Sequence, residues 1–180
     1  MSLIDPRIVE NTWSREFSEL ELQAIQELLE LYGKVSALFS TPCGKCPVSF
    51  RCCTVANCVG LAASDLKDRK IPYQYPETKY KGFMTSSGCS LPAYLRTVCS
   101  EYVCSVGLDH SDWMEKKTVH FQRIAALEKL LVEDFKLDPM ICMFRVNGGE
   151  RDPRFEAQPK DDLGDVVMGD LSQRWNERFD

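Results

Sequence analysis

The sequence predicts a mainly α-helical protein in which two long helices bracket a cysteine-rich, loop-rich lobe. Apolar residues recur at helical spacing over residues 18–39 and again over residues 112–135. Between these stretches, residues 40–108 hold eight of the nine cysteines together with repeated proline and glycine. This composition disfavours long helices and is typical of loops. We therefore expect one domain over residues 1–146 and a polar, acidic, mostly irregular tail over residues 147–180.

The first ten residues are expected to form an extended arm, and the first long helix follows with a clear start. Ser18 and Glu21 have the spacing of a capping box, in which each side chain binds the backbone N–H of the other. The apolar positions that follow lie on one helical face: Leu22, Ile25, Leu28, Leu29, Tyr32 and Phe39. The pattern predicts a helix over residues 18–39.

The second half of the chain contains the other long helix. A short helix is expected near Ser64 or Asp65, followed by an extended loop over residues 71–83, where Pro72 and Pro76 stand. A cap at Ser111 or Asp112 starts the helix predicted over residues 112–135, and these residues share one face: Trp113, His120, Ile124, Leu127 and Leu131. The apolar run over residues 140–146 is expected to be a strand or a core segment.

Charge and hydropathy exclude several classes of protein. The net charge is −5 and the pI is about 5.2, which disfavours general electrostatic binding to nucleic-acid phosphates. No apolar run approaches the roughly 20 residues that cross a bilayer. The first residues also lack the apolar core of a secretory signal. We expect a cytoplasmic protein without a membrane segment.

The cysteines are the main chemical signal. In a reducing compartment thiols stay unpaired unless something binds them, and the cysteine count is odd, so metal ligation is favoured over disulfides. The predicted metal ligands are Cys43, Cys46, Cys52, Cys53, Cys89, Cys99 and Cys104, and the role of Cys58 stays open. The lobe between the helices is thus expected to be a metal-binding lobe. Cys142 stands alone in an apolar run and is expected to be a buried thiol.

The spacing of these cysteines bears on which metal they hold. Cys43 and Cys46 form a CxxC pair, whereas structural zinc ribbons usually carry two such pairs. The remaining thiols are irregularly spaced, which suits an iron–sulfur cluster. We expect a [4Fe–4S] cluster, narrowly favoured over zinc, with two zinc ions sharing eight thiols as a further alternative. A dithiol redox role is disfavoured because the pair follows a helix and precedes Pro47.

These motifs carry a resemblance to a known family. The Cys43–Cys46 pair, the Cys52-Cys53 doublet and the Gly88–Cys104 stretch with Arg96 resemble the CxxCxxCC cysteine-cluster family, a zinc- or iron-chelating domain that includes the YkgJ-type proteins. The resemblance covers about residues 39–104. It implies metal binding and, through a similar cluster in flagellin lysine methylases, an iron–sulfur centre. The chain departs from the family pattern in the five residues, 47–51, that separate Cys46 from the doublet.

The function beyond metal binding is left open by the sequence. The chain has two histidines, so few of its side chains can act as general acids or bases at neutral pH. We therefore favour a protein with a structural metal that acts through a protein partner over an enzyme. One alternative is a redox or accessory enzyme that uses the cluster. Another is a single-stranded nucleic-acid binder, because basic and aromatic residues alternate over residues 67–83.

Overall fold

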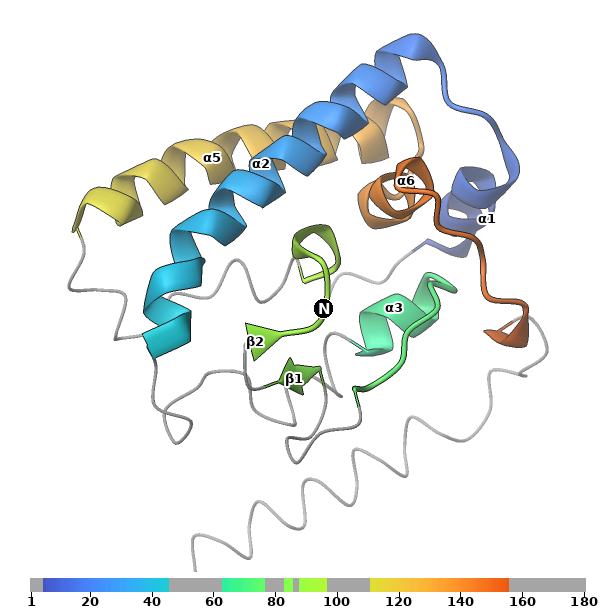
Figure 1. The fold of residues 1–180 in the computed structure, drawn as a ribbon. Helices are drawn as coiled ribbons and strands as arrows, with labels where there is room; N and C mark the ends of the chain where they lie inside the picture. The colour runs from blue at the N-terminus through green and yellow to red at the C-terminus, as the bar shows by residue number, and fades with distance from the viewer. Residues whose placement is uncertain (1–4, 46–62, 77–82, 86–87, 97–110, 156–180) are drawn as a thin grey trace, which may run out of the picture.

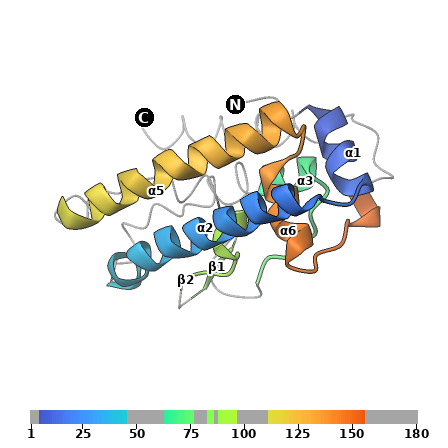
Figure 2. The ribbon, with the colours of Figure 1, turned by 90° about the horizontal axis from the view of Figure 1, so that it is seen from above.

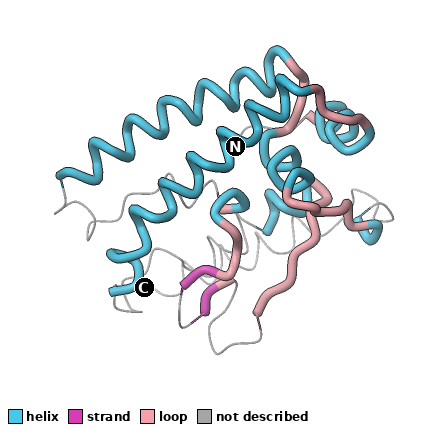
Figure 3. Tube along the Cα trace, turned by 45° about the horizontal axis from the view of Figure 1, so that its top comes forward, coloured by secondary structure: helices cyan, strands magenta, loops and turns pink. Residues whose placement is uncertain are grey.

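The structure of the chain is a computed structural model that describes residues 5–45, 63–76, 83–85, 88–96 and 111–155. Within these ranges the protein is mainly α-helical, and its strands are two segments of two residues each (Figure 3). The helices are α1 (Pro6–Ser14), α2 (Glu19–Lys45), α3 (Ser64–Asp68), α5 (Ser111–Lys129) and α6 (Pro139–Val146). The shorter elements are β1 (Met84–Thr85), β2 (Gly88–Cys89), the 3-10 turns η3 (Ala93–Leu95) and η6 (Pro153–Phe155), and the π-helical turn η5 (Leu130–Asp134). In this part of the chain, no helix is long and apolar enough to cross a membrane.

The two predicted long helices are present as α2 and α5, which lie side by side and run in opposite directions (Figure 1, Figure 2). Ile25, Leu28 and Val35 of α2 pack with Ile124 and Leu127 of α5 in one apolar core. Each of these side chains is at most 3% exposed. The apolar spacing that predicted the helices therefore marks most of the buried face, but Leu22, which the pattern also included, is 36% exposed.

Polar contacts fix this helix pair along its length. The Tyr32 hydroxyl donates a hydrogen bond of 2.7 Å to the Glu128 carboxylate. Across the exposed edge of the same interface, Arg123 Nε donates to Glu27 Oε1 at 2.6 Å. Both bonds join α2 to α5 within one stretch of the interface, so they contribute to the register of the two helices there.

The start of α2 confirms the capping box, while its end differs from the prediction. The Ser18 backbone N–H donates to Glu21 Oε2 at 2.8 Å, and the Glu21 N–H donates to Ser18 Oγ at 3.4 Å. The helix predicted to end at residue 39 continues past Pro42 to Lys45. Proline removes one backbone donor, and that local loss does not end a helix whose earlier turns are packed against α5.

Pro6–Ser14 form a helix where the sequence indicated an extended arm, while residues 1–4 lie outside the described ranges. Asp5 caps α1 by accepting a hydrogen bond of 2.9 Å from the Arg7 backbone N–H. Pro6 follows at the first helical position, where its fixed φ angle suits a helix start. α1 buries Val9 and Thr12 against the rest of the domain.

The apolar run over residues 140–146 is the helix α6 and not a strand. Asp138 is its N-cap and accepts a 3.1 Å hydrogen bond from the Ile141 backbone N–H. Met140 and Ile141 belong to a core shared with α1 and α3, whereas Cys142 and Met143 belong to the core of α2 and α5. A helix between two cores buries successive residues, here Met140 to Met143, so this stretch lacks the one-faced pattern of a surface helix.

The core shared with α1 and α3 also supports the hairpin of β1 and β2. Met84 pairs with Cys89 and Thr85 pairs with Gly88, in antiparallel register. Phe83, just before β1, is fully buried in this core. The described residues 71–76 have no regular secondary structure, in agreement with the predicted loop.

The start of the predicted tail is docked on the domain. The Asp152 backbone N–H donates a 3.1 Å hydrogen bond to the Lys70 carbonyl, and η6 follows. Asp152 is buried, with 4% of its surface exposed. The domain therefore extends beyond residue 146, while residues 156–180 lie outside the described ranges.

Candidate metal centre

The predicted metal ligands fall mostly outside the described residues. The structure describes the backbone of Cys43 and the position of Cys89. The other predicted ligands, Cys46, Cys52, Cys53, Cys99 and Cys104, lie outside those ranges, as does Cys58. The structure describes the elements that flank the cysteine-bearing segments, namely α2, the hairpin of β1 and β2, η3 and α5. These elements are called the framework below.

Cys43 belongs to the last turn of α2. The described part of the helix reaches Lys45, and Cys46, the second member of the pair, lies outside the described residues. A cysteine pair that begins in a helical turn is held at its first member by the backbone hydrogen bonds of the helix. The framework therefore fixes where the CxxC pair begins.

Cys89 stands on β2, opposite Met84 in the hairpin. It is partly buried and packs against the core shared by α1 and α3. The next residue strengthens the hairpin, because the Ser90 backbone N–H donates a 2.8 Å hydrogen bond to the Phe83 carbonyl. A thiol held on a short, anchored hairpin and only partly buried suits a soft metal ligand.

A hydrogen bond ties the segment ahead of Cys99 to the helix that carries Cys43. Arg96 Nη2 donates to Ser36 Oγ of α2 at 3.1 Å. Ser36 precedes Cys43 by seven residues, about 10 Å along the helix axis, and Arg96 precedes Cys99 by three residues. The bond therefore restricts how far Cys99 can lie from α2.

The helix pair brings the flanks of two cysteine-bearing segments to one end of the molecule. Because α2 and α5 are antiparallel, the C-terminal end of α2 and the N-terminal end of α5 lie at the same end (Figure 1, Figure 2). The segment with four of the cysteines leaves from Lys45, and the segment with Cys99 and Cys104 leads into Ser111. The donor set is thiolate sulfur, which suits zinc and iron–sulfur centres alike.

Cys142 does not share these properties and confirms the prediction of a buried thiol. Its side chain is fully buried on α6, within the core of α2 and α5. Burial raises the pKa of the Cys142 thiol far above its usual range, with the nearby Asp138 carboxylate adding to the effect. Since the thiolate is the form that binds metals, Cys142 does not fit a ligand role.

The basic residues of the predicted nucleic-acid surface are partly neutralised. Arg69 is paired with Asp138, with 2.9 Å between Nε and Oδ2, and with Asp65 at 3.4 Å. Lys70 is paired with Glu10. Desolvation raises the pKa of Asp65 despite the Arg69 guanidinium beside it. Arg69 and Lys70 of the 67–83 stretch therefore already form ion pairs within the domain.

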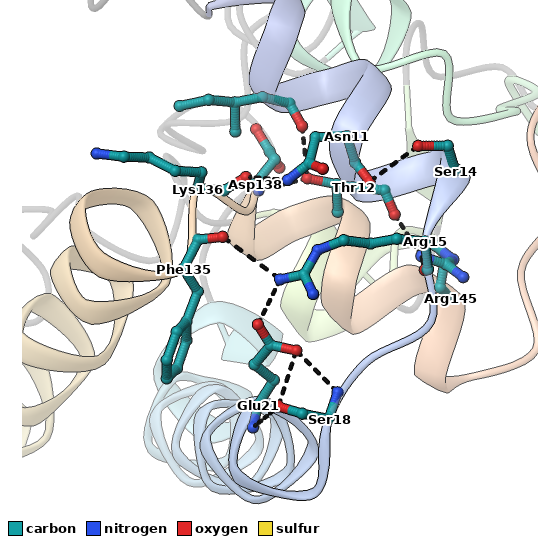
Figure 4. Close-up of polar contacts among 11 residues, drawn as sticks. Asn11, Thr12, Ser14, Arg15, Ser18, Glu21, Phe135, Lys136, Asp138 and Arg145 are labelled. Carbon is teal, nitrogen blue, oxygen red and sulfur yellow. Dashed lines mark hydrogen bonds and ion pairs between the residues drawn. The ribbon is translucent and has the colours of Figure 1, made fainter.

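A polar network between α1, α2 and α6 was not predicted from the sequence (Figure 4). Arg15 pairs with Glu21, and its guanidinium also donates to the Phe135 carbonyl at 3.4 Å. Arg145 of α6 donates to the carbonyls of Thr12 and Arg15. The Ser18–Glu21 capping box is the part of this network that the sequence indicates. The two arginines lie far apart in the sequence, so no local pattern links them to it.

The electrostatics of this network stabilise the fold. Burial by itself raises the pKa of Glu21, but the hydrogen bonds from Arg15 and from Ser18 outweigh it and hold the pKa below its usual range. The Arg145 guanidinium lies over the Phe17 ring, 4.4 Å from the ring centre. These contacts hold the N-terminal end of α2 against α6.

Among the described residues, no group of three or more histidine, cysteine, aspartate or glutamate side chains is placed to hold a metal ion. Comparison with family models, with curated proteins and with solved structures finds no match to this chain.

Proposed function

We propose that the chain binds a metal centre through cysteine thiolates and that this centre joins the segments between the two long helices. A [4Fe–4S] cluster is favoured over zinc, because the thiols are irregularly spaced along the chain. The proposed ligands are Cys43, Cys46, Cys52, Cys53, Cys89, Cys99 and Cys104.

The observation that supports the proposal is the Arg96–Ser36 hydrogen bond of 3.1 Å. It ties the chain three residues before Cys99 to the helix that ends two residues after Cys43. Two cysteine-bearing segments that are distant in the sequence therefore start from a shared, buried framework. Convergence of thiols from such segments is what a tetrahedral thiolate centre requires.

The role that we propose for the metal is structural. A bound thiolate centre cross-links the loops that hold it, and its binding contributes an ordering free energy on the order of 10 kcal/mol. The chain's own thiols supply the charge and the soft sulfur donors. In this account the metal lobe and the helix pair form one scaffold, and the scaffold acts by binding a protein partner.

The proposal is tested by the metal content of cysteine variants. Cys46→Ser and Cys99→Ser each remove a proposed ligand and should lower the metal bound per folded chain by at least half. Cys142→Ser is the matched control, because its thiol is buried in the helical core. Its metal content should equal that of the unmodified chain. Equal loading of all three variants, measured by elemental analysis after anaerobic purification, contradicts the ligand assignment.

A further inference from the structure

An open groove runs beside the hairpin, on the face formed by the loop after α3. One wall is the extended segment 72–76, and the other is made by residues 90–92, 94 and 95. Phe144 of α6 also lines it. The volume is about 670 Å³, within the size range of ligand-binding sites in proteins.

Aromatic rings form much of the surface of this groove. Tyr73 and Tyr75 of the first wall pack edge to face, with ring centres 5.7 Å apart. Both rings rest on the buried Phe83, at 5.7 Å and 4.8 Å. Tyr94 belongs to the opposite wall. Because Phe83 is fully buried, it holds the two tyrosine rings of the first wall in fixed positions.

The groove is rich in proline and uncharged along the residues that line it. Pro72, Pro76 and Pro92 are part of its walls, and its polar groups are tyrosine hydroxyls, Gln74 and Ser90. None of these lining residues carries a formal charge. A strand of nucleic acid needs cations along its phosphates, so this lining does not complement it. The lining complements an uncharged, extended ligand.

We propose that the groove binds a proline-rich peptide in the polyproline II conformation. Proline rings pack on tyrosine faces, and recognition of such peptides by aromatic grooves is a recurring mode of binding. The polyproline II backbone makes no internal hydrogen bonds, so its carbonyls can accept hydrogen bonds from polar side chains of the walls such as Gln74. Little conformational entropy is lost, because the peptide is already extended.

The proposed function holds that the chain acts by binding a protein partner. This inference rests on that statement and adds the chemistry of the partner. The Ser90–Phe83 hydrogen bond of 2.8 Å joins the second wall to the hairpin that carries Cys89. The metal centre and the groove therefore share one structural support, yet the groove residues themselves bind no metal in this account.

The test is a titration of the full chain, purified anaerobically, with a proline peptide of about ten residues, roughly 30 Å long when extended. A peptide of equal length with alanine in place of each proline is the control ligand. We expect saturable binding of the proline peptide and none of the alanine peptide. Tyr75→Ala should weaken binding about tenfold or more, and Tyr75→Phe, which keeps the ring, should weaken it less.

Val119→Ala is the control variant, because Val119 is 60% exposed on α5 and lies outside the groove lining. It should bind as the unmodified chain does. Circular dichroism checks that each variant is folded, and elemental analysis of the same samples reports the metal independently. Absence of binding by a folded, metal-loaded chain overturns the inference alone. Equal binding by Tyr75→Ala, or binding of a single-stranded oligonucleotide in place of the proline peptide, overturns it as well.

Discussion

The Arg69 guanidinium and the Asp138 carboxylate form a largely buried ion pair, with 2.9 Å between Nε and Oδ2. The same carboxylate caps α6 through the Ile141 backbone N–H. The Asp138 backbone N–H in turn donates to Thr12 Oγ of α1 at 2.8 Å. One residue thus joins the end of α3, the start of α6 and α1, which are far apart in the sequence.

Asp138→Ala should destabilise the domain strongly. The substitution removes a helix cap and leaves Arg69, 15% exposed, with Asp65 as its remaining ion-pair partner among those described. A loss of about 3 kcal/mol in the free energy of unfolding is expected for breaking a buried pair. Chemical denaturation measures it. Asp134→Ala, at an exposed position of η5, is the control and should change stability by less than about 0.5 kcal/mol. Similar losses in both variants contradict the role assigned to Asp138.

Two leucines of α2 should respond very differently to truncation. Leu28 is fully buried against α5, whereas Leu20 is 69% exposed near the helix start. Leu28→Ala removes buried apolar surface and leaves a cavity, so a loss of about 2–5 kcal/mol is expected. Leu20→Ala should cost less than about 0.5 kcal/mol. Thermal or urea unfolding distinguishes them, and equal costs mean that α2 buries another face.

Glu21 should make the stability of the domain depend on pH. The pKa of Glu21 in the folded protein is held below its usual value. The ionised side chain therefore stabilises the fold fully above the unfolded-state pKa of about 4.3, and this stabilisation is lost as the pH falls through the folded-state pKa. Glu21→Gln should therefore cost about 1 kcal/mol near pH 7 and less near pH 3.

Urea unfolding at both pH values measures this difference. Glu16→Gln is the control, because Glu16 is exposed in the turn before α2. A penalty for Glu21→Gln that stays constant between the two pH values means that the Arg15 and Ser18 contacts do not lower the pKa of Glu21.

Cys142 should resist alkylation in the folded protein. Its thiol is buried and its pKa is raised by burial, so the reactive thiolate is scarce. Iodoacetamide at mildly alkaline pH should label Cys142 only after unfolding, which mass spectrometry of the peptide that carries it can follow. Cys89, partly buried on the hairpin, should be labelled in the folded chain once chelators have removed metal. Rapid labelling of Cys142 in the native state contradicts its placement in the core.

The two long helices could be predicted because their sequences carry one-faced apolar patterns and, for α2, a capping box. α6 could not be distinguished from a strand by its pattern, since Met140 to Met143 are buried on all sides. The signal that identifies it is the Asp138-Pro139 pair, which starts a helix as readily as it ends one. The same pair of residue types, Asp5-Pro6, marks α1, which is too short for a periodic pattern.

The candidate site is proposed from the sequence as a set of residues, and the sequence carries no geometry for them. Cysteine spacing indicates which thiols are available, and burial distinguishes Cys142 from the partly buried Cys89. The Arg96–Ser36 contact depends on how η3 packs on α2, which no local pattern reveals. The aromatic groove likewise depends on long-range packing, because Tyr75 and Tyr94 line one groove only when the loop after α3 folds back beside η3.

The most direct measurement is the content of iron, acid-labile sulfide and zinc per chain in anaerobically purified protein, read together with its visible spectrum. We expect a stoichiometric thiolate-bound metal. The favoured form contains iron and sulfide in equal amounts, with a visible absorption that bleaches on reduction. Stoichiometric zinc in a colourless protein also agrees with a structural thiolate site. A folded chain that holds neither metal, with the eight cysteines of residues 40–108 reduced and open to alkylation, contradicts the proposed metal centre.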